Sequence, residues 1–498
     1  MRSRRRFLKE TALAAGLSCG LSREVQAARA GRSVQAENQK EGSTDWQLTR
    51  VRIDNTNCRS PWVEGYCSKQ SVAADETIEF MVSLDRPGRC RLEIFRMGYY
   101  QGRGARLMHS TEFEARPQPL PTAGPKRLME CNWEPSSKLQ IPGHWKSGVY
   151  LGRLTRVPHK NSEAAWQSYI IFIVRDDRPA DFLFKCSDNT WQAYNRWPNR
   201  FSLYDDGSKR DWTSGAAVDV SFDRPYGKYR QIYDNPQSVG SGEFLCWEFP
   251  MAYWMEKEGY DVTYCSQADM LTPDRGSKCK CLLSIGHDEY WDLAEYHATR
   301  ALIDSGVSAL FLSGNSLCWV TPMTSSTDGR AHRVITRAGP YSGYAGHVPE
   351  DGSKFTVTGP DEGLIMGARN VSPVNGGGDW IVTKPGHWIF RGTKMKKGEA
   401  IPGLVGWEYH GNPAPLPGLE VVAEGTALVG GETPQHWTAT IHPGPKNNFV
   451  FNAATIFWAQ GLSSPPGHML PWSHWVRPHG PDARVQRITR NLLERACS

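Results

Sequence analysis

The stretch Ser284-Ile285-Gly286-His287-Asp288-Glu289-Tyr290-Trp291 places an imidazole, two carboxylates and a phenol on one predicted loop. The apolar run 279–286 is typical of a buried strand, and the run 307–313 has the same character. Between them, residues 290–303 have the spacing of an amphipathic helix. This strand, loop, helix and strand predict an α/β sheet, in which ligands bind at the carboxyl ends of the strands.

The same rhythm predicts an α/β domain over residues 176–498, with a mostly parallel sheet and a mixed, strand-rich extension towards its end. Further helices are expected at 244–258 and 485–496. Residues 47–175 differ, because short alternating runs separated by Pro and Gly predict strands only. That region is expected to form an all-β sandwich of the immunoglobulin-like kind.

The first residues are typical of an export signal. Ser3-Arg4-Arg5-Arg6-Phe7-Leu8-Lys9, a mildly apolar run and a small-residue site near Ala27 predict a twin-arginine signal over residues 1–27. The apolar run is too short to span a bilayer stably, so we expect a periplasmic or secreted protein without a membrane span. Residues 28–46 are polar and charged, which predicts a flexible linker.

Charge and cysteine content exclude some function classes. The signal holds six Arg or Lys and two Glu, and so supplies +4 of the formal net charge of +6. The remaining charge is small and scattered, and gives no electrostatic case for nucleic acid. None of the twelve cysteines has the CxxC spacing of a zinc site. Most are expected to be small buried residues, and one or two disulfides, such as Cys58 with Cys67, are left open.

The loop residues suggest chemistry of more than one kind. His287 and Glu289 lie two positions apart, so on extended backbone both side chains point the same way. Such a pair suits a metal site, but a polar loop that only holds the sheet edge is the plain alternative. Polar and aromatic loops also follow the strands before 187 and 313, and three such strand ends are expected to converge on one site. The GxSxG, P-loop, GxGxxG and HExxH motifs are missing, so serine esterase, nucleotide-binding, dehydrogenase and zinc-helix functions lack support.

Several segments together resemble the large (beta) subunit of N,N-dimethylformamidase, in the same order along the chain. They are Arg96-Met97-Gly98-Tyr99-Tyr100-Gln101-Gly102, Thr190-Trp191-Gln192-Ala193-Tyr194-Asn195, Phe201-Ser202-Leu203-Tyr204-Asp205, Gly286-His287-Asp288-Glu289-Tyr290, Gly314-Asn315-Ser316-Leu317-Cys318-Trp319 and Gly406-Trp407-Glu408. The resemblance covers most of residues 60–465 and is strongest over 180–320.

The resemblance implies an amidohydrolase that uses one iron ion and cleaves a small-molecule amide at its C–N bond, giving acid and amine. The implied roles are metal ligands at Tyr194, Tyr204 and Glu289, a neighbour of the metal at His287, a substrate contact at Asn315 and an acid/base group at Glu408. Phenolate and carboxylate oxygens are hard anionic donors, which favour mononuclear Fe(III). The chain departs from the family pattern at Asp288, where Pro is usual, and at Trp191 and Cys318, where Tyr is usual.

Two other functions are kept as alternatives. With 19 Trp and 18 Tyr, the chain suits a carbohydrate- or envelope-binding protein whose α/β domain has lost its activity. A glycoside hydrolase would instead use Glu289 and Glu408 as its carboxylate pair. The sequence leaves open the substrate and the oligomeric state, a homo-oligomer included.

Overall fold

The computed structural model describes residues 34–160, 163–209, 212–213, 217–229, 235–342, 355, 357–469 and 480–498. The predicted export signal lies outside them. Among the helices within them, none has the length and apolar character needed to cross a membrane.

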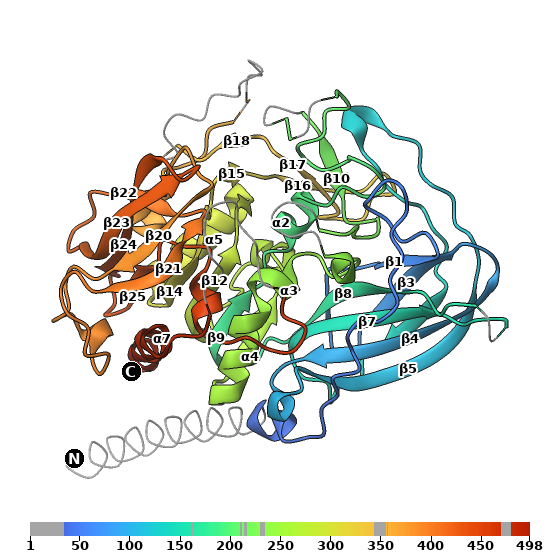
Figure 1. Cartoon of the computed structure of the whole chain (residues 1–498), viewed down its shortest axis with the longest axis horizontal. Helices are drawn as coiled ribbons and strands as arrows, with labels where there is room; N and C mark the ends of the chain where they lie inside the picture. The colour runs from blue at the N-terminus through green and yellow to red at the C-terminus, as the bar shows by residue number, and fades with distance from the viewer. Residues whose placement is uncertain are drawn as a thin grey trace, which may run out of the picture.

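Two sheets in the first third of the chain enclose one core, on the right of Figure 1. The smaller sheet has the order β1-β3-β6 and the larger the order β2-β8-β7-β4-β5. The strands are β1 (Val63–Cys67), β2 (Ser71–Ala73), β3 (Thr77–Leu84), β4 (Gly88–Met97), β5 (Ala105–Ala115), β6 (Ser137–Gln140), β7 (Gly148–Arg156) and β8 (Gln167–Arg175). This arrangement is compatible with the expected immunoglobulin-like sandwich.

Alternation along the strands explains how the larger sheet buries both of its faces. On β4, Leu92 and Ile94 pack in the core shared with the smaller sheet. Phe95 and Met97 point the other way and join the core of the rest of the molecule. Arg96 on β4 and Glu256 on α4 (Phe249–Glu258) also form a fully buried ion pair of 2.7 Å. The sandwich and the following region are therefore packed together.

The central sheet has nine strands in the order β11-β9-β12-β14-β25-β24-β23-β20-β21. The first five strands run parallel to one another, and each pair from β25 to β21 is antiparallel. The strands are β9 (Ala180–Lys185), β11 (Val262–Cys265), β12 (Cys279–His287), β14 (Ser308–Gly314), β20 (Gly376–Ile381), β21 (Ala400–Trp407), β23 (Glu420–Val429), β24 (Thr433–Pro443) and β25 (Phe449–Asn452).

The expectation of a mostly parallel α/β domain is wrong. The described part of the chain is mostly strands, with a large mixed sheet and few helices. In the described residues, most helices that connect the parallel strands lie between β9 and β14, the stretch from which the α/β pattern was inferred. The pairs formed among β20, β21, β23, β24 and β25 are antiparallel, so these pairs need no crossover helix.

The helices differ from expectation mainly at their boundaries. They are α2 (Asp188–Ala193), α3 (Phe244–Trp247), α4, α5 (Leu293–Ser305), α6 (Gly363–Met366) and α7 (Ala483–Cys497). The predicted helix 244–258 is split into α3 and α4 at Glu248, with Pro250 in the first turn of α4, where its missing N–H does no harm. The predicted helix 290–303 starts later, because Tyr290 and Trp291 form a short strand and Asp292 caps α5.

The short strands β10, β15, β16, β17 and β18 lie above the central sheet in Figure 1, whereas β22 lies at the upper left beside β23. The short sheets contain β10 (Asp219–Ser221), β13 (Tyr290–Trp291), β15 (Trp319–Val320), β16 (Met323–Thr324), β17 (Val334–Thr336), β18 (Gly339–Pro340), β19 (Ala368–Asn370) and β22 (His410–Pro413). Ten of the eleven cysteines in the described residues are buried. Cys67 is a free thiol, so the disulfide left open between it and Cys58 is not formed here.

Candidate metal centre

His287 and Glu289 are positioned by the end of β12. His287 is the last residue of that strand, and Gly286 before it has a φ of +67°, a conformation that suits glycine. A Cβ on Gly286 would lie 2.6 Å from Cβ of Trp247, so the backbone also packs too closely there for any other residue. The strand thus ends in a tight, buried turn that carries the imidazole and the carboxylate.

Tyr194 and Tyr204 come from the segment that follows α2. Tyr194 is the residue at the carboxyl end of that helix. The fully buried Arg224 holds the segment by donating hydrogen bonds to the carbonyls of Asn195, Trp197 and Phe201, at 3.0, 3.0 and 2.9 Å. Because these carbonyls lie between the two tyrosines, Arg224 fixes the path that brings both phenols to one place.

The two phenols meet the Glu289 carboxylate. Oη of Tyr194 lies 2.5 Å from Oε2 of Glu289 and 3.2 Å from Oη of Tyr204. Oη of Tyr204 lies 3.3 Å from Oε1 of Glu289 and also contacts Oη of Tyr290. The three oxygen donors predicted from the sequence are therefore brought together, close enough to share one ion.

Glu408 joins the same cluster from the other side of the imidazole. Nε2 of His287 lies 2.9 Å from Oε2 of Glu408 and 3.1 Å from Oε2 of Glu289. Burial raises the pKa of Glu408 to about 7, although the His287 charge acts to lower it. Burial alone would lower the pKa of His287, but the carboxylates of Glu408 and Glu243 raise it well above its usual value.

The donor set fits a metal ion. His287, Glu289 and Glu408 each offer one ligand atom within 4.8 Å of the others. Nε2 of His287 and Oε2 of Glu408 are buried, yet neither makes a hydrogen bond of acceptable geometry in the part of the chain described. Burial and then the Glu289 carboxylate raise the pKa of Tyr194 far above its usual value. Without a nearby cation the phenol therefore stays protonated and donates to Glu289, whereas a bound metal ion would favour the phenolate.

Asn315 lies beside the cluster but is not joined to it by a hydrogen bond within the described residues. It follows Gly314, which pairs with His287 across β12 and β14. Its side chain is buried, its φ is +53°, and its Oδ1 has no hydrogen-bond partner there. The predicted substrate contact therefore stays a prediction.

Three residues were given no role by the sequence. Oε2 of Glu243 lies 3.0 Å from Nδ1 of His287 and orients the ring. Nε1 of Trp319 donates to Oε1 of Glu289 at 2.8 Å. Tyr290, next to Glu289, reaches the phenol of Tyr204. Tyr290 and Trp319 stood in the segments that carried the resemblance, whereas Glu243 lies in no recognisable motif.

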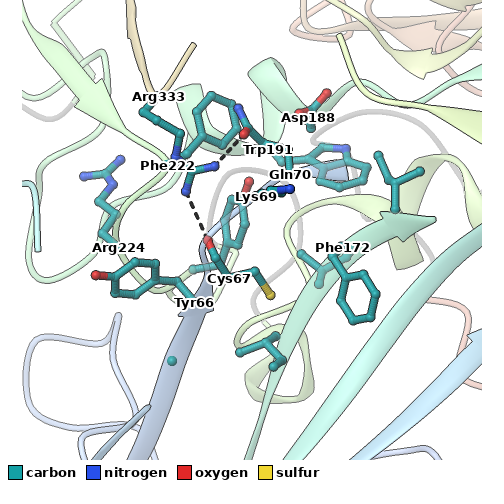
Figure 2. Close-up of a pocket in the computed structure, with 15 residues that line it drawn as sticks. Tyr66, Cys67, Lys69, Gln70, Phe172, Asp188, Trp191, Phe222, Arg224 and Arg333 are labelled. Carbon is teal, nitrogen blue, oxygen red and sulfur yellow. Dashed lines mark hydrogen bonds between the residues drawn. The ribbon is translucent and has the colours of Figure 1, made fainter. Parts of the chain in front are cut away.

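A separate pocket lies on the sandwich side of α2. Figure 2 shows Asp188 and Trp191 of that helix facing Cys67 and Phe172 of the sandwich, with Arg333 donating to the Cys67 carbonyl at 3.0 Å. None of the six predicted site residues lines this pocket. It is therefore distinct from the candidate metal centre.

The comparisons with known proteins agree with the resemblance. The family model described as N,N-dimethylformamidase beta subunit-like, C-terminal, matches residues 91–471, which include all six predicted site residues. No curated protein matches the chain.

Proposed function

Because the chain belongs to the N,N-dimethylformamidase beta subunit-like family, we propose that it hydrolyses the C–N bond of an amide at a mononuclear Fe(III) site. Membership supports a hydrolase of this kind. The observation that carries the proposal is the convergence of the Tyr194, Tyr204 and Glu289 oxygens, separated by 2.5 to 3.3 Å.

The proposed ligands are the two phenolates and the Glu289 carboxylate. Hard anionic oxygens of this kind favour Fe(III) over zinc, which is more often held by His and Cys. A bound Fe(III) ion would act as a Lewis acid that polarises the amide carbonyl and acidifies water. Trp319 and Tyr290 hold two of the ligand groups through their own hydrogen bonds.

Glu408 is the proposed acid/base group. With a pKa of about 7, it exchanges protons readily near neutral pH. It takes a proton from the water whose oxygen bonds to the carbonyl carbon. It then gives that proton to the nitrogen as the C–N bond breaks, so the products are a carboxylic acid and an amine.

His287 is the proposed stabiliser of the negative charge that develops on the carbonyl oxygen. Glu243 and Glu408 hold the imidazole in its charged form, and Glu243 fixes its orientation through Nδ1. Nε2 lies between the Glu289 and Glu408 carboxylates, at 3.1 and 2.9 Å, and is the donor that we propose turns towards the substrate oxygen. Asn315, whose buried amide is one residue beyond the strand partner of His287, is the proposed second contact to the substrate.

Iron analysis, visible spectroscopy and an amine-release assay test the proposal. We expect stoichiometric iron, a phenolate-to-Fe(III) charge-transfer band and release of dimethylamine from N,N-dimethylformamide. A colourless, metal-free protein that binds glycans and releases no amine would instead support the carbohydrate-binding alternative.

The glycoside hydrolase alternative gains no support from the site. A carboxylate pair working on a sugar needs open space between its members. Here the imidazole of His287 lies within 3.1 Å of both Glu289 and Glu408, and two phenols contact Glu289. Export by the twin-arginine route remains part of the proposal, based on the arginine-rich start of the sequence.

A further inference from the structure

Arg337 is a buried cation beside the candidate metal centre, with no hydrogen-bond or ion-pair partner among the residues that the structure describes. It lies between β17 and β18 and is only 4% exposed. Its Nε, Nη1 and Nη2 are all buried without a hydrogen bond, and no carboxylate pairs with it in the described part of the chain. By contrast, the buried Arg224 donates to several carbonyls, and the buried Arg333 pairs with Asp223 at 2.7 Å.

Such a group is costly to keep. A guanidinium stays charged at any ordinary pH, so it cannot avoid the cost of burial by losing its proton. Leaving a buried charge unpaired destabilises the fold, and buried charges are therefore normally paired. An arginine whose five N–H donors lack protein partners in the described residues can therefore be stabilised by a bound anion, such as a carboxylate of the substrate.

The aromatic rings around Arg337 leave its donors available. Its guanidinium carbon lies 4.5 Å from the centre of the Tyr204 ring and 4.8 Å from that of the Trp319 ring. Such stacking uses the faces of the guanidinium, whereas its N–H groups point outwards in its plane. The rings fix the position of the charge without satisfying its hydrogen bonds, as a site for a carboxylate requires.

The same two rings connect Arg337 to the reacting centre. Tyr204 and Trp319 both place a polar atom against Oε1 of Glu289, at 3.3 and 2.8 Å. One aromatic side chain therefore separates the guanidinium from a proposed metal ligand.

We propose that Arg337 binds a carboxylate of the substrate, so that the enzyme acts on anionic amides, such as short N-acyl amino acids. This inference rests on the proposed amide hydrolysis and names its substrate class. In such a molecule one carbon separates the carboxylate from the amide nitrogen, and in the protein one aromatic side chain separates Arg337 from Glu289. A neutral amide would leave the guanidinium unpaired.

Another role for Arg337 would be to balance the acidic groups of the centre. Its charge does act to lower the pKa of Tyr204, against the larger effect of burial. If this were its function, removing it would weaken iron binding and would affect neutral and anionic substrates alike. The two roles therefore differ in a measurable way.

The test compares N-formylglycine with N-formylglycinamide, which carry a carboxylate and a neutral carboxamide at the same position, and it follows the release of formate, which only cleavage of the formyl C–N bond gives. We expect kcat/KM to be higher for N-formylglycine, and Arg337→Gln to remove about tenfold to a hundredfold of that preference, the value of a charge-assisted hydrogen bond pair. The iron should remain bound, and the loss of kcat/KM should be much smaller for N-formylglycinamide than for N-formylglycine. Arg300→Gln, at an exposed arginine on α5, is the matched control and should keep the preference.

Two results would overturn the inference. One is equal kcat/KM for both compounds in the unaltered protein, and the other is a parallel loss of iron and of both activities in Arg337→Gln. If neither compound is hydrolysed, the proposed function fails, and calorimetric binding still decides the inference. Tighter binding of N-formylglycine than of its amide, lost in Arg337→Gln, supports it, and equal binding rejects it.

Discussion

Replacing Lys185 by Met tests whether a buried ion network holds the loop that carries His287 and Glu289. Nζ of Lys185 lies 2.7 Å from Oδ2 of Asp288 and 2.6 Å from Oε1 of Glu295, and 3.3 Å from the centre of the Trp291 ring. The side chains of Lys185, Asp288 and Glu295 are fully buried. Asp288 sits between the two predicted site residues, so its position controls theirs.

The substitution removes the cation and keeps the volume of the side chain. The buried Asp288 carboxylate then loses its only cationic partner in the described residues. It still accepts the hydrogen bond from the hydroxyl of Ser284 at 2.6 Å. Removing one member of a buried ion pair costs about 3–5 kcal/mol, a large part of the roughly 5–15 kcal/mol that a domain has in total. We expect the free energy of unfolding, measured in urea by tryptophan fluorescence, to fall by that amount and the bound iron to fall with it.

Lys280→Met is the matched control. Lys280 lies on the same strand, but its side chain is about half exposed and pairs with Asp181 at 2.8 Å on the surface. An exposed pair contributes about 0–1 kcal/mol, so the control should unfold nearly as the unaltered protein does. If Lys185→Met were no more destabilising than Lys280→Met, the argument that this network positions the loop would be refuted.

Three further changes test the site and its surroundings. Glu289→Gln should abolish iron binding, whereas Glu408→Gln should keep the iron and lose turnover; metal analysis beside an amine-release assay would expose a reversal of these roles. Burial raises the pKa of Glu295 to about 8 in the folded protein, against about 4.3 in the unfolded chain. Between these two pH values the folded state binds more protons than the unfolded state, so the free energy of unfolding falls as the pH rises. Glu295→Gln should flatten this fall in urea unfolding by up to about 1.4 kcal/mol per pH unit, and an unchanged slope would contradict the assignment. Gly314→Ala would put a Cβ 2.3 Å from the Glu408 carbonyl oxygen and should destabilise the protein by about 1–3 kcal/mol. Because the clash is with Glu408, turnover should fall more than iron content. A larger loss of iron than of turnover would contradict this packing argument.

The sequence was informative where the signal is local. The predicted strands 279–286 and 307–313 agree with β12 and β14 within one residue at each end. A short apolar run between polar loops is typical of a buried strand. The convergence of Tyr194 and Glu289 followed from the parallel pairing of β9 with β12, which brings their carboxyl ends together. That part of the site could therefore be predicted from local patterns together with the resemblance.

The mixed sheet could not be predicted in the same way, because strand direction depends on pairing between distant segments. One local signal was available. Gly430 and Gly431 separate two strand-like runs, and both have positive φ. Such a glycine pair is typical of a hairpin, which would have indicated antiparallel β23 and β24. Glu243 had no such signal, since it precedes α3 without any motif and its contact with His287 spans more than forty residues.

The mixed sheet explains how the acid/base group reaches the ligands. The proposed ligands come from loops of the parallel half, after α2 and after β12, whereas Glu408 follows β21 at the far edge of the antiparallel half. Its backbone nevertheless packs against Gly314 at the end of β14, and its carbonyl accepts a hydrogen bond from Ile456 at 3.1 Å. The antiparallel half must therefore curve back over the ends of the parallel strands. The proposed metal ligands and the proposed acid/base group thus come from different halves of one sheet, so we expect a change near Glu408 to reduce turnover and leave the ligand set in place.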